Sequence, residues 1–122
     1  MSTGAQAYTR TVQASAPARE IEAQALLKAA KQLQDVQTHW PEIDQQHIEA
    51  ALRFNRQLWV IFLSAAQNDE NPQPIEIRQQ IANLGIFVMN QTVDMQLAPE
   101  PKKLSSLIEI NRNIAAGLSG RA

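Results

Sequence analysis

The residues that could carry catalysis or bind a metal are few, and their spacing suits neither task. The chain contains two histidines and no cysteine. His39 and His47 lie on opposite sides of Pro41, and neither has a second histidine four residues away, the spacing of zinc ligands on one helix. Glu20 and Glu22 are two residues apart on a predicted helix, so their carboxylates point in different directions. We therefore expect no catalytic residue, no metal site and no cofactor, and hence no enzyme.

Two asparagines are the polar residues whose positions are unexpected. Asn55 and Asn111 each lie within an apolar stripe of a predicted helix. An unsatisfied buried amide costs about 1–3 kcal/mol, so each side chain needs a partner. One interpretation is structural: each amide bonds a backbone group or the other amide and fixes the register of the helices. The other is that the amides are offered to a bound helix.

Composition indicates a single domain, residues 1–122, of an ordinary globular protein. Eleven basic and twelve acidic residues give a net charge of −1, which argues against direct binding of nucleic acid or of an anionic membrane. The N-terminal residues have no apolar core of a signal peptide. The longest run of large apolar residues, Leu58 to Leu63, is far too short for membrane insertion. We expect a cytoplasmic location.

The chain reads as helices separated by proline-bearing breaks, because strand-like alternation is absent and only four glycines occur. Ser15 to Pro17 predicts a helix start, and Asp44 predicts an N-cap. Long amphipathic helices with short connections favour an all-α, up-and-down helical bundle. The expected elements are a short N-terminal helix over 3–14, carrying Tyr8 and Val12, and four main helices over 18–38, 44–66, 74–97 and 101–118.

The predicted helix from Pro74 to Leu97 is apolar on two sides. Its first apolar face consists of Ile77, Ile81, Leu84, Val88 and Met95. Its second consists of Ile75, Ala82, Ile86, Met89, Val93 and Leu97. A helix with two apolar faces must be covered twice, either by other helices or by a partner. Gly85, in the middle of this helix, indicates a close helix crossing.

Large apolar residues divide into a predicted core and a predicted partner surface. Trp59, Phe62, Leu63 and Phe87 are expected in the core. A further set exceeds what one bundle face requires, and either packs on the first two helices or receives an external amphipathic helix. This partner-binding set consists of Phe54, Ile61, Ile86, Met89, Val93 and Leu97.

Four segments give the chain a resemblance to a known family. They are AYTRTVQASAPAREIEAQALLKAAKQL, ALRFNRQLWVIFLSA, NPQPIEIRQQIANLGIFV and LSSLIEINRNIAAGLSG, in this order. Together they resemble the FlaF family of flagellar biosynthesis regulators, most specifically in NRQLW at 55–59 and INRNIAAGL at 110–118. The departures, residues 34–47 and 90–101, lie at the predicted breaks.

The resemblance implies an α-proteobacterial cytoplasmic protein that acts with flagellin, alongside a FlbT-type regulator. It implies a secretion chaperone that binds helical segments of unassembled flagellin and couples flagellin synthesis to export. The family supplies no agreed catalytic or cofactor residues, so the partner-binding residues rest on periodicity alone. Two alternatives stay open: an RNA-binding post-transcriptional regulator of flagellin, which the near-neutral charge disfavours, and a self-associating helical scaffold.

Overall fold

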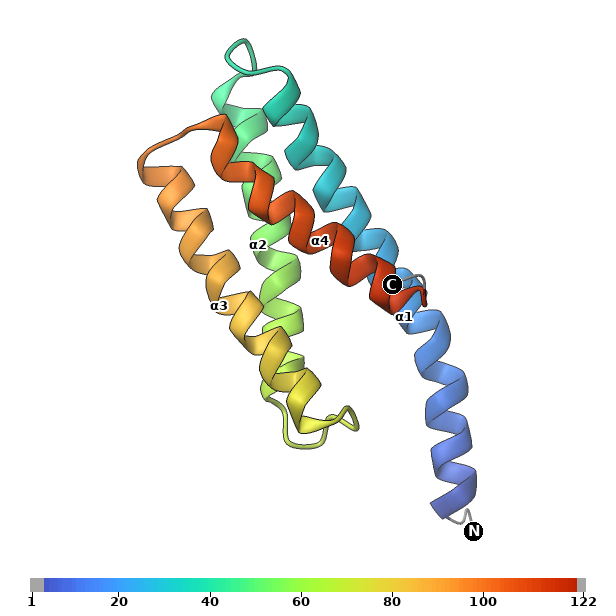
Figure 1. The fold of residues 1–122 in the computed structure, drawn as a ribbon. Helices are drawn as coiled ribbons and strands as arrows, with labels where there is room; N and C mark the ends of the chain where they lie inside the picture. Colours follow the sequence, from blue (N-terminus) through green and yellow to red (C-terminus); the bar gives the residue numbers. More distant parts are fainter. Residues whose placement is uncertain (1–3, 121–122) are drawn as a thin grey trace.

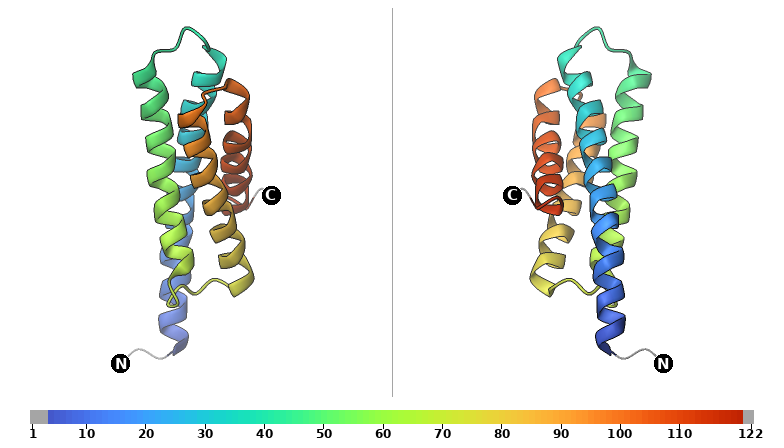
Figure 2. Two further views of the ribbon diagram at one scale, coloured as in Figure 1. Left: turned by 90° about the vertical axis from the view of Figure 1, so that its left-hand side faces the viewer. Right: turned by 90° about the vertical axis from the view of Figure 1, so that its right-hand side faces the viewer.

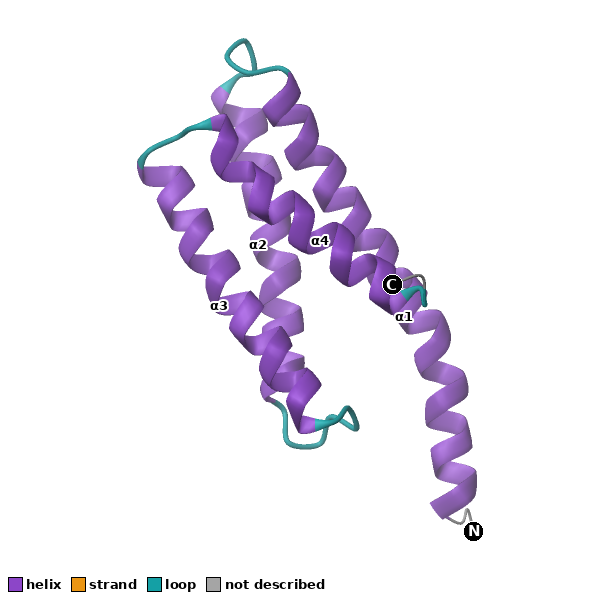
Figure 3. Cartoon of the chain, viewed as in Figure 1, coloured by secondary structure: helices purple, strands orange, loops and turns teal. Residues whose placement is uncertain are grey.

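The computed structural model describes the backbone of residues 4–120 and the side chains of residues 17–120. Within these residues the chain is all-α, without a strand, and the predicted fold class is confirmed. The elements are α1 (Gly4–Thr38), α2 (Gln45–Gln67), α3 (Ile75–Leu97), the short 3₁₀ helix η1 (Pro101–Lys103) and α4 (Leu104–Leu118) (Figures 1 and 3).

Local sequence signals set most of the helix ends. The Asp44 side chain accepts a hydrogen bond from the His47 backbone N–H at 2.9 Å, so Asp44 is the N-cap of α2, as the sequence predicts. Pro74 directly precedes α3, where its lack of an N–H costs nothing. Pro101 opens η1, which leads into α4. The predicted bounds of the last three main helices therefore hold within three residues.

The start of the first helix was predicted wrongly. Instead of a break at Ser15 to Pro17, α1 runs without interruption from Gly4, with Pro17 inside it. A proline costs a helix one backbone hydrogen bond but does not end it when good helix formers lie on both sides, as the alanines and glutamines do here. The side chains of Tyr8 and Val12 lie outside the described residues.

The helices form two antiparallel pairs, α1 with α4 and α2 with α3. The pairs meet along the line where α1 packs on α2, which we call the α1–α2 seam. α4 packs chiefly on α1, α3 packs chiefly on α2, and α1 and α2 pack on each other. α3 and α4 meet near their connection and diverge from there, with α4 following α1 (Figure 1). Figure 2 shows that the N-terminal part of α1 extends past the α2–α3 loop. The result is an up-and-down bundle that is closed at one end and open at the other.

All four helices contribute to the core, whose largest fully buried side chains are Leu26, Leu33, Leu52, Trp59, Val88, Met95, Leu104 and Leu107. Trp59 and Phe62 are buried as predicted, and their rings meet edge to face with centroids 5.5 Å apart. Leu63 is half-buried. Phe87 is 43% exposed, so its assignment to the core was wrong. The reason is that α4, which would cover Phe87 in a parallel-sided bundle, follows α1 instead.

Candidate functional site

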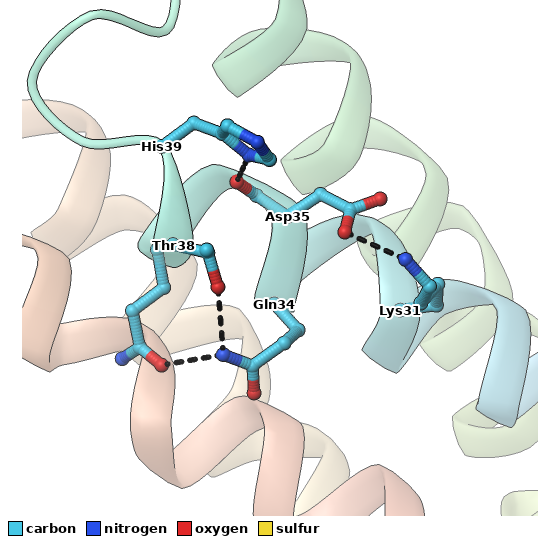
Figure 4. A network of polar contacts seen from close by, with 6 residues as sticks. Lys31, Gln34, Asp35, Thr38 and His39 are labelled. Atoms are coloured by element: carbon cyan, nitrogen blue, oxygen red, sulfur yellow. Dashed lines mark hydrogen bonds and ion pairs between the residues drawn. The ribbon is translucent and has the colours of Figure 1, made fainter.

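The two histidines lie at helix ends, where each side chain contacts a helix-terminal acceptor. His39 Nδ1 lies 2.8 Å from the Asp35 carbonyl oxygen at the end of α1, beside the Lys31–Asp35 ion pair (Figure 4). His47 Nδ1 lies 2.7 Å from Asp44 Oδ1 at the start of α2, where hydrogen bonds from His47 lower the pKa of the Asp44 carboxyl. Among residues 17–120, no group of three metal-binding side chains comes together.

The two glutamates near the start of α1 also lie in different surroundings. Glu20 accepts hydrogen bonds from Gln24 at 3.1 Å and from the Ser119 hydroxyl at 3.4 Å on the surface. Glu22 lies half-buried beside Arg19. Burial raises the pKa of the Glu22 carboxyl, and the positive charge of Arg19 opposes this rise. The structure thus gives the two carboxylates different neighbours.

The predicted asparagine pair forms a polar contact in the middle of the core. Asn111 Nδ2 donates to Asn55 Oδ1 at 2.7 Å and to the Leu26 carbonyl oxygen at 3.4 Å. Asn111 Oδ1 accepts from Trp59 Nε1 at 2.9 Å. Both amides are fully buried and join α1, α2 and α4. The Asn111–Asn55 contact is the kind that the structural interpretation predicts, in which each amide bonds a backbone group or the other amide.

Four residues of the predicted partner-binding set share the outward side of α3. We call this surface, completed by one more residue at its start, the α3 outer face: Ile75, Ile86, Met89, Val93 and Leu97. Its exposed fractions are 56% at Ile75, 50% at Ile86, 51% at Val93 and 81% at Leu97, whereas Met89 is half-buried against the core. No helix of the described chain covers this face.

The other two predicted residues, Phe54 and Ile61, lie elsewhere. Leu63 marks the side of α2 that contacts α3, because its Cβ lies 3.3 Å from the position that a Cβ on Gly85 would occupy. At 100° per residue, Phe54 and Ile61 point about 180° and 160° away from Leu63. Consistent with this, Lys28 of α1 lies 5.4 Å from the centre of the Phe54 ring. The structure therefore places Phe54 on the α1–α2 seam and Ile61, which is 63% exposed, farther along the same side of α2, and both lie apart from the α3 outer face.

A cavity at the open end of the bundle was not foreseen from the sequence. It has a volume of about 480 Å³ and receives side chains from all four helices and from the α2–α3 loop. We call it the open-end cavity; its walls include Trp59, Phe62, Ala66, Ile81, Ile114 and Leu118, with Ala18, Arg19 and Glu22 on the α1 side. A sequence signal existed: Arg19 and Glu22 precede Leu26 by seven and four residues, so charged residues continue the core-facing stripe of α1.

Comparison with known proteins assigns the chain to a family. A sequence model of the family described as flagellar protein FlaF matches residues 4–118. No curated protein and no solved structure matches the chain. In the part of the chain that the structure describes, no helix combines the length and apolarity needed to cross a membrane.

Proposed function

Since the chain belongs to the FlaF family of flagellar proteins, we propose that it binds flagellin in the cytoplasm as a secretion chaperone and couples flagellin synthesis to export. The flagellar context comes from the family, and the binding role rests on the apolar surface that the fold leaves uncovered. The proposal involves no catalysis and no cofactor.

The observation that carries the proposal is the exposure of the α3 outer face. Four of its five aliphatic residues are half exposed or more, on a helix whose opposite side is already packed on the bundle. Burying one such side chain is worth roughly 1.5–3 kcal/mol, so a covering partner gains several such contributions. Ile86, Met89, Val93 and Leu97 follow one another at intervals of three or four residues, so they form one stripe on which the apolar face of an amphipathic helix can pack.

The α3 outer face is the primary docking surface in this proposal, with Ile86, Met89, Val93 and Leu97 as the contacts. Phe54 and Ile61 form a separate, smaller contact on the side of α2 turned away from α3, because one straight helix on α3 does not reach the opposite side of α2. A FlbT-type regulator is a further candidate partner, for which this side of α2 offers a free surface.

The test is size-exclusion chromatography with light scattering of the protein alone and with monomeric flagellin. A monomer that forms a one-to-one complex supports the proposal, and Val93→Asp should then weaken binding at least about tenfold, as expected for a charge placed in a buried interface. Asn113→Asp, which adds the same carboxylate on the exposed side of α4, is the matched control. An oligomer that ignores flagellin would instead mean that the α3 outer face is covered by a second copy of the chain.

A further inference from the structure

The open end of the bundle lacks the fourth helix that closes the other end. α4 has 15 residues, whereas α2 and α3 have 23 each. Because α4 starts at the closed end and stops beside the middle of α1, the other three helices continue beyond it (Figure 1). The open-end cavity lies where α4 would continue, and Leu118, the last residue of α4, lines it.

The face of α3 that packs in the core continues toward this open end and becomes exposed there. Val88 and Met95, in the C-terminal half of α3, are fully buried. Ile81 and Leu84 are half-buried on the same face, and Ile77 is 40% exposed. Phe87, on the side of α3 turned toward α4, is also exposed. The core-facing side of α3 is thus buried at the closed end of the bundle, where α4 helps to cover it. At the open end, the same side of α3 is an exposed apolar surface.

The charged residues in the cavity wall indicate which kind of side chain an occupant should carry. Glu22 lines the open-end cavity, half-buried, and forms no ion pair with any residue whose side chain the structure describes. The positive charge of Arg19 offsets only part of the cost of burying this carboxylate, because burial is the larger influence on Glu22, and a second basic group brought close would offset more of it. Arg19, three residues before Glu22, also lines the cavity.

We propose that the space beyond α4 is a docking site for an amphipathic helix of flagellin, whose aliphatic side chains enter the open-end cavity and whose basic side chain pairs with Glu22. The inference rests on the proposed function, since it gives flagellin a second contact besides the α3 outer face. A helix about 10–12 Å across fits this position because α4, also a helix, fills the corresponding position at the closed end. The cavity then accepts the anchoring side chains, as in other helix-in-groove complexes.

Filling the cavity tests the inference by calorimetric titration with monomeric flagellin. Ala18 lies exposed at the cavity wall, so Ala18→Trp should occupy the cavity without disturbing the core, and we expect at least about a tenfold loss of affinity. Asn113→Trp, at an exposed position of α4 outside the cavity lining, should bind as the unmodified protein does. Glu22→Lys should also weaken binding, and more than Glu22→Gln does. Melting curves establish that each variant is folded.

The outcomes separate the inference from the proposed function. If flagellin binds the unmodified protein and Val93→Asp weakens binding but Ala18→Trp and Glu22→Lys do not, the inference fails and the proposed function stands. If flagellin does not bind the unmodified protein at all, the proposed function fails and the inference falls with it.

Trp59 gives a second readout that does not depend on filling the cavity. The chain has two tryptophans, so Trp40→Phe leaves Trp59, in the cavity wall, as the single fluorescent indole. Saturation with a tryptophan-free flagellin should change the emission of Trp59. Unchanged emission at saturation would overturn the inference.

Discussion

Asn111 is the residue on which the polar interior of the bundle depends. Its amide bonds Trp59, Asn55 and the Leu26 carbonyl oxygen at once, whereas Asn55 Nδ2 has no hydrogen-bond partner among residues 17–120. The sequence could predict that the two asparagines meet, because each interrupts an apolar stripe. It could not predict the indole contact, since the partner of Trp59 depends on how far α4 is shifted along α2.

Removing this amide should therefore cost more than removing its neighbour. In Asn111→Ala the Trp59 indole N–H and the Asn55 oxygen both lose their partner, and we expect unfolding free energy to fall by roughly 2–4 kcal/mol. Asn55→Ala removes a side chain that is only partly satisfied and should cost less. Urea denaturation measures both, with Asn113→Ala on the exposed side of α4 as control. Equal losses in the two core variants would contradict this account.

Glu22 should make stability depend on pH in a defined direction. Burial raises the pKa of Glu22 above its ordinary value of 4.5, so the ionised form is less favourable in the folded protein than in the unfolded chain. This unfavourable contribution is present at neutral pH and disappears as pH falls through the raised pKa. Glu22→Gln should stabilise the fold at neutral pH by less than about 1 kcal/mol, because the half-exposed carboxylate remains partly hydrated.

The check on Glu22 is urea denaturation at about pH 7 and about pH 4, on either side of the carboxyl titration. The advantage of Glu22→Gln should shrink at the lower pH. Glu20→Gln, on the exposed side of the same helix, should show no comparable gain at either pH. A gain from Glu22→Gln that is independent of pH would rule out ionisation as its cause.

At the scale of elements, prolines were reliable signals of helix ends except at Pro17. Pro41, Pro74 and Pro101 fall where polar or extended residues leave no helical pattern to continue. Pro17 falls between two stretches of strong helix formers, and the helix propensity of the flanks outweighs the loss of one hydrogen bond. A proline destabilises a helix, and the helix propensity of the flanking residues decides whether the helix continues through it.

Gly85 in α3 and Gly117 in α4 should respond oppositely to the same substitution. A Cβ on Gly85 would lie 3.3 Å from both Cβ and Cδ1 of Leu63, so the Leu63 side chain would have to shift by a few tenths of an ångström. Crowding at that crossing should exceed the helix-propensity gain, and we expect Gly85→Ala to lose up to about 2 kcal/mol. A Cβ on Gly117 would meet nothing within 4 Å, so Gly117→Ala should gain up to about 1 kcal/mol. Thermal unfolding of both variants checks the sign; stabilisation by Gly85→Ala would remove the close-crossing explanation.

At the scale of the molecule, the sequence predicted four helices in an up-and-down bundle but not its open end. Amphipathic patterns identify which face of a helix is buried, and they do not identify which neighbour buries it. Phe87 shows the difference: its position on α3 reads as core, yet it is exposed because α4 packs on α1. The open-end cavity was missed for the same reason, since it exists only through the divergence of α3 and α4.

This divergence should make the two halves of α3 unequal in local stability. The C-terminal half is tied to the η1–α4 segment by the hydrogen bond from Gln91 Nε2 to the Lys103 carbonyl oxygen at 3.0 Å and by the Asp94–Lys103 ion pair at 3.1 Å. The N-terminal half rests chiefly on α2 and borders the open-end cavity. Segments with fewer buried contacts open more often, so amide hydrogens of 79–87 should exchange about tenfold faster than those of 88–97.

Hydrogen-exchange mass spectrometry of the free protein and of its flagellin complex measures this difference. In the complex, docking beyond α4 should slow exchange in 79–87 most, whereas docking on the α3 outer face alone should slow exchange mainly in 88–97, where Met89, Val93 and Leu97 lie. Lys103→Ala provides the control, because releasing the C-terminal half from α4 should raise its exchange toward that of the N-terminal half. Equal exchange along α3 in the free protein would mean that the open end is as stable as the closed one. The region around the cavity would then not unfold locally more often than the rest of the bundle.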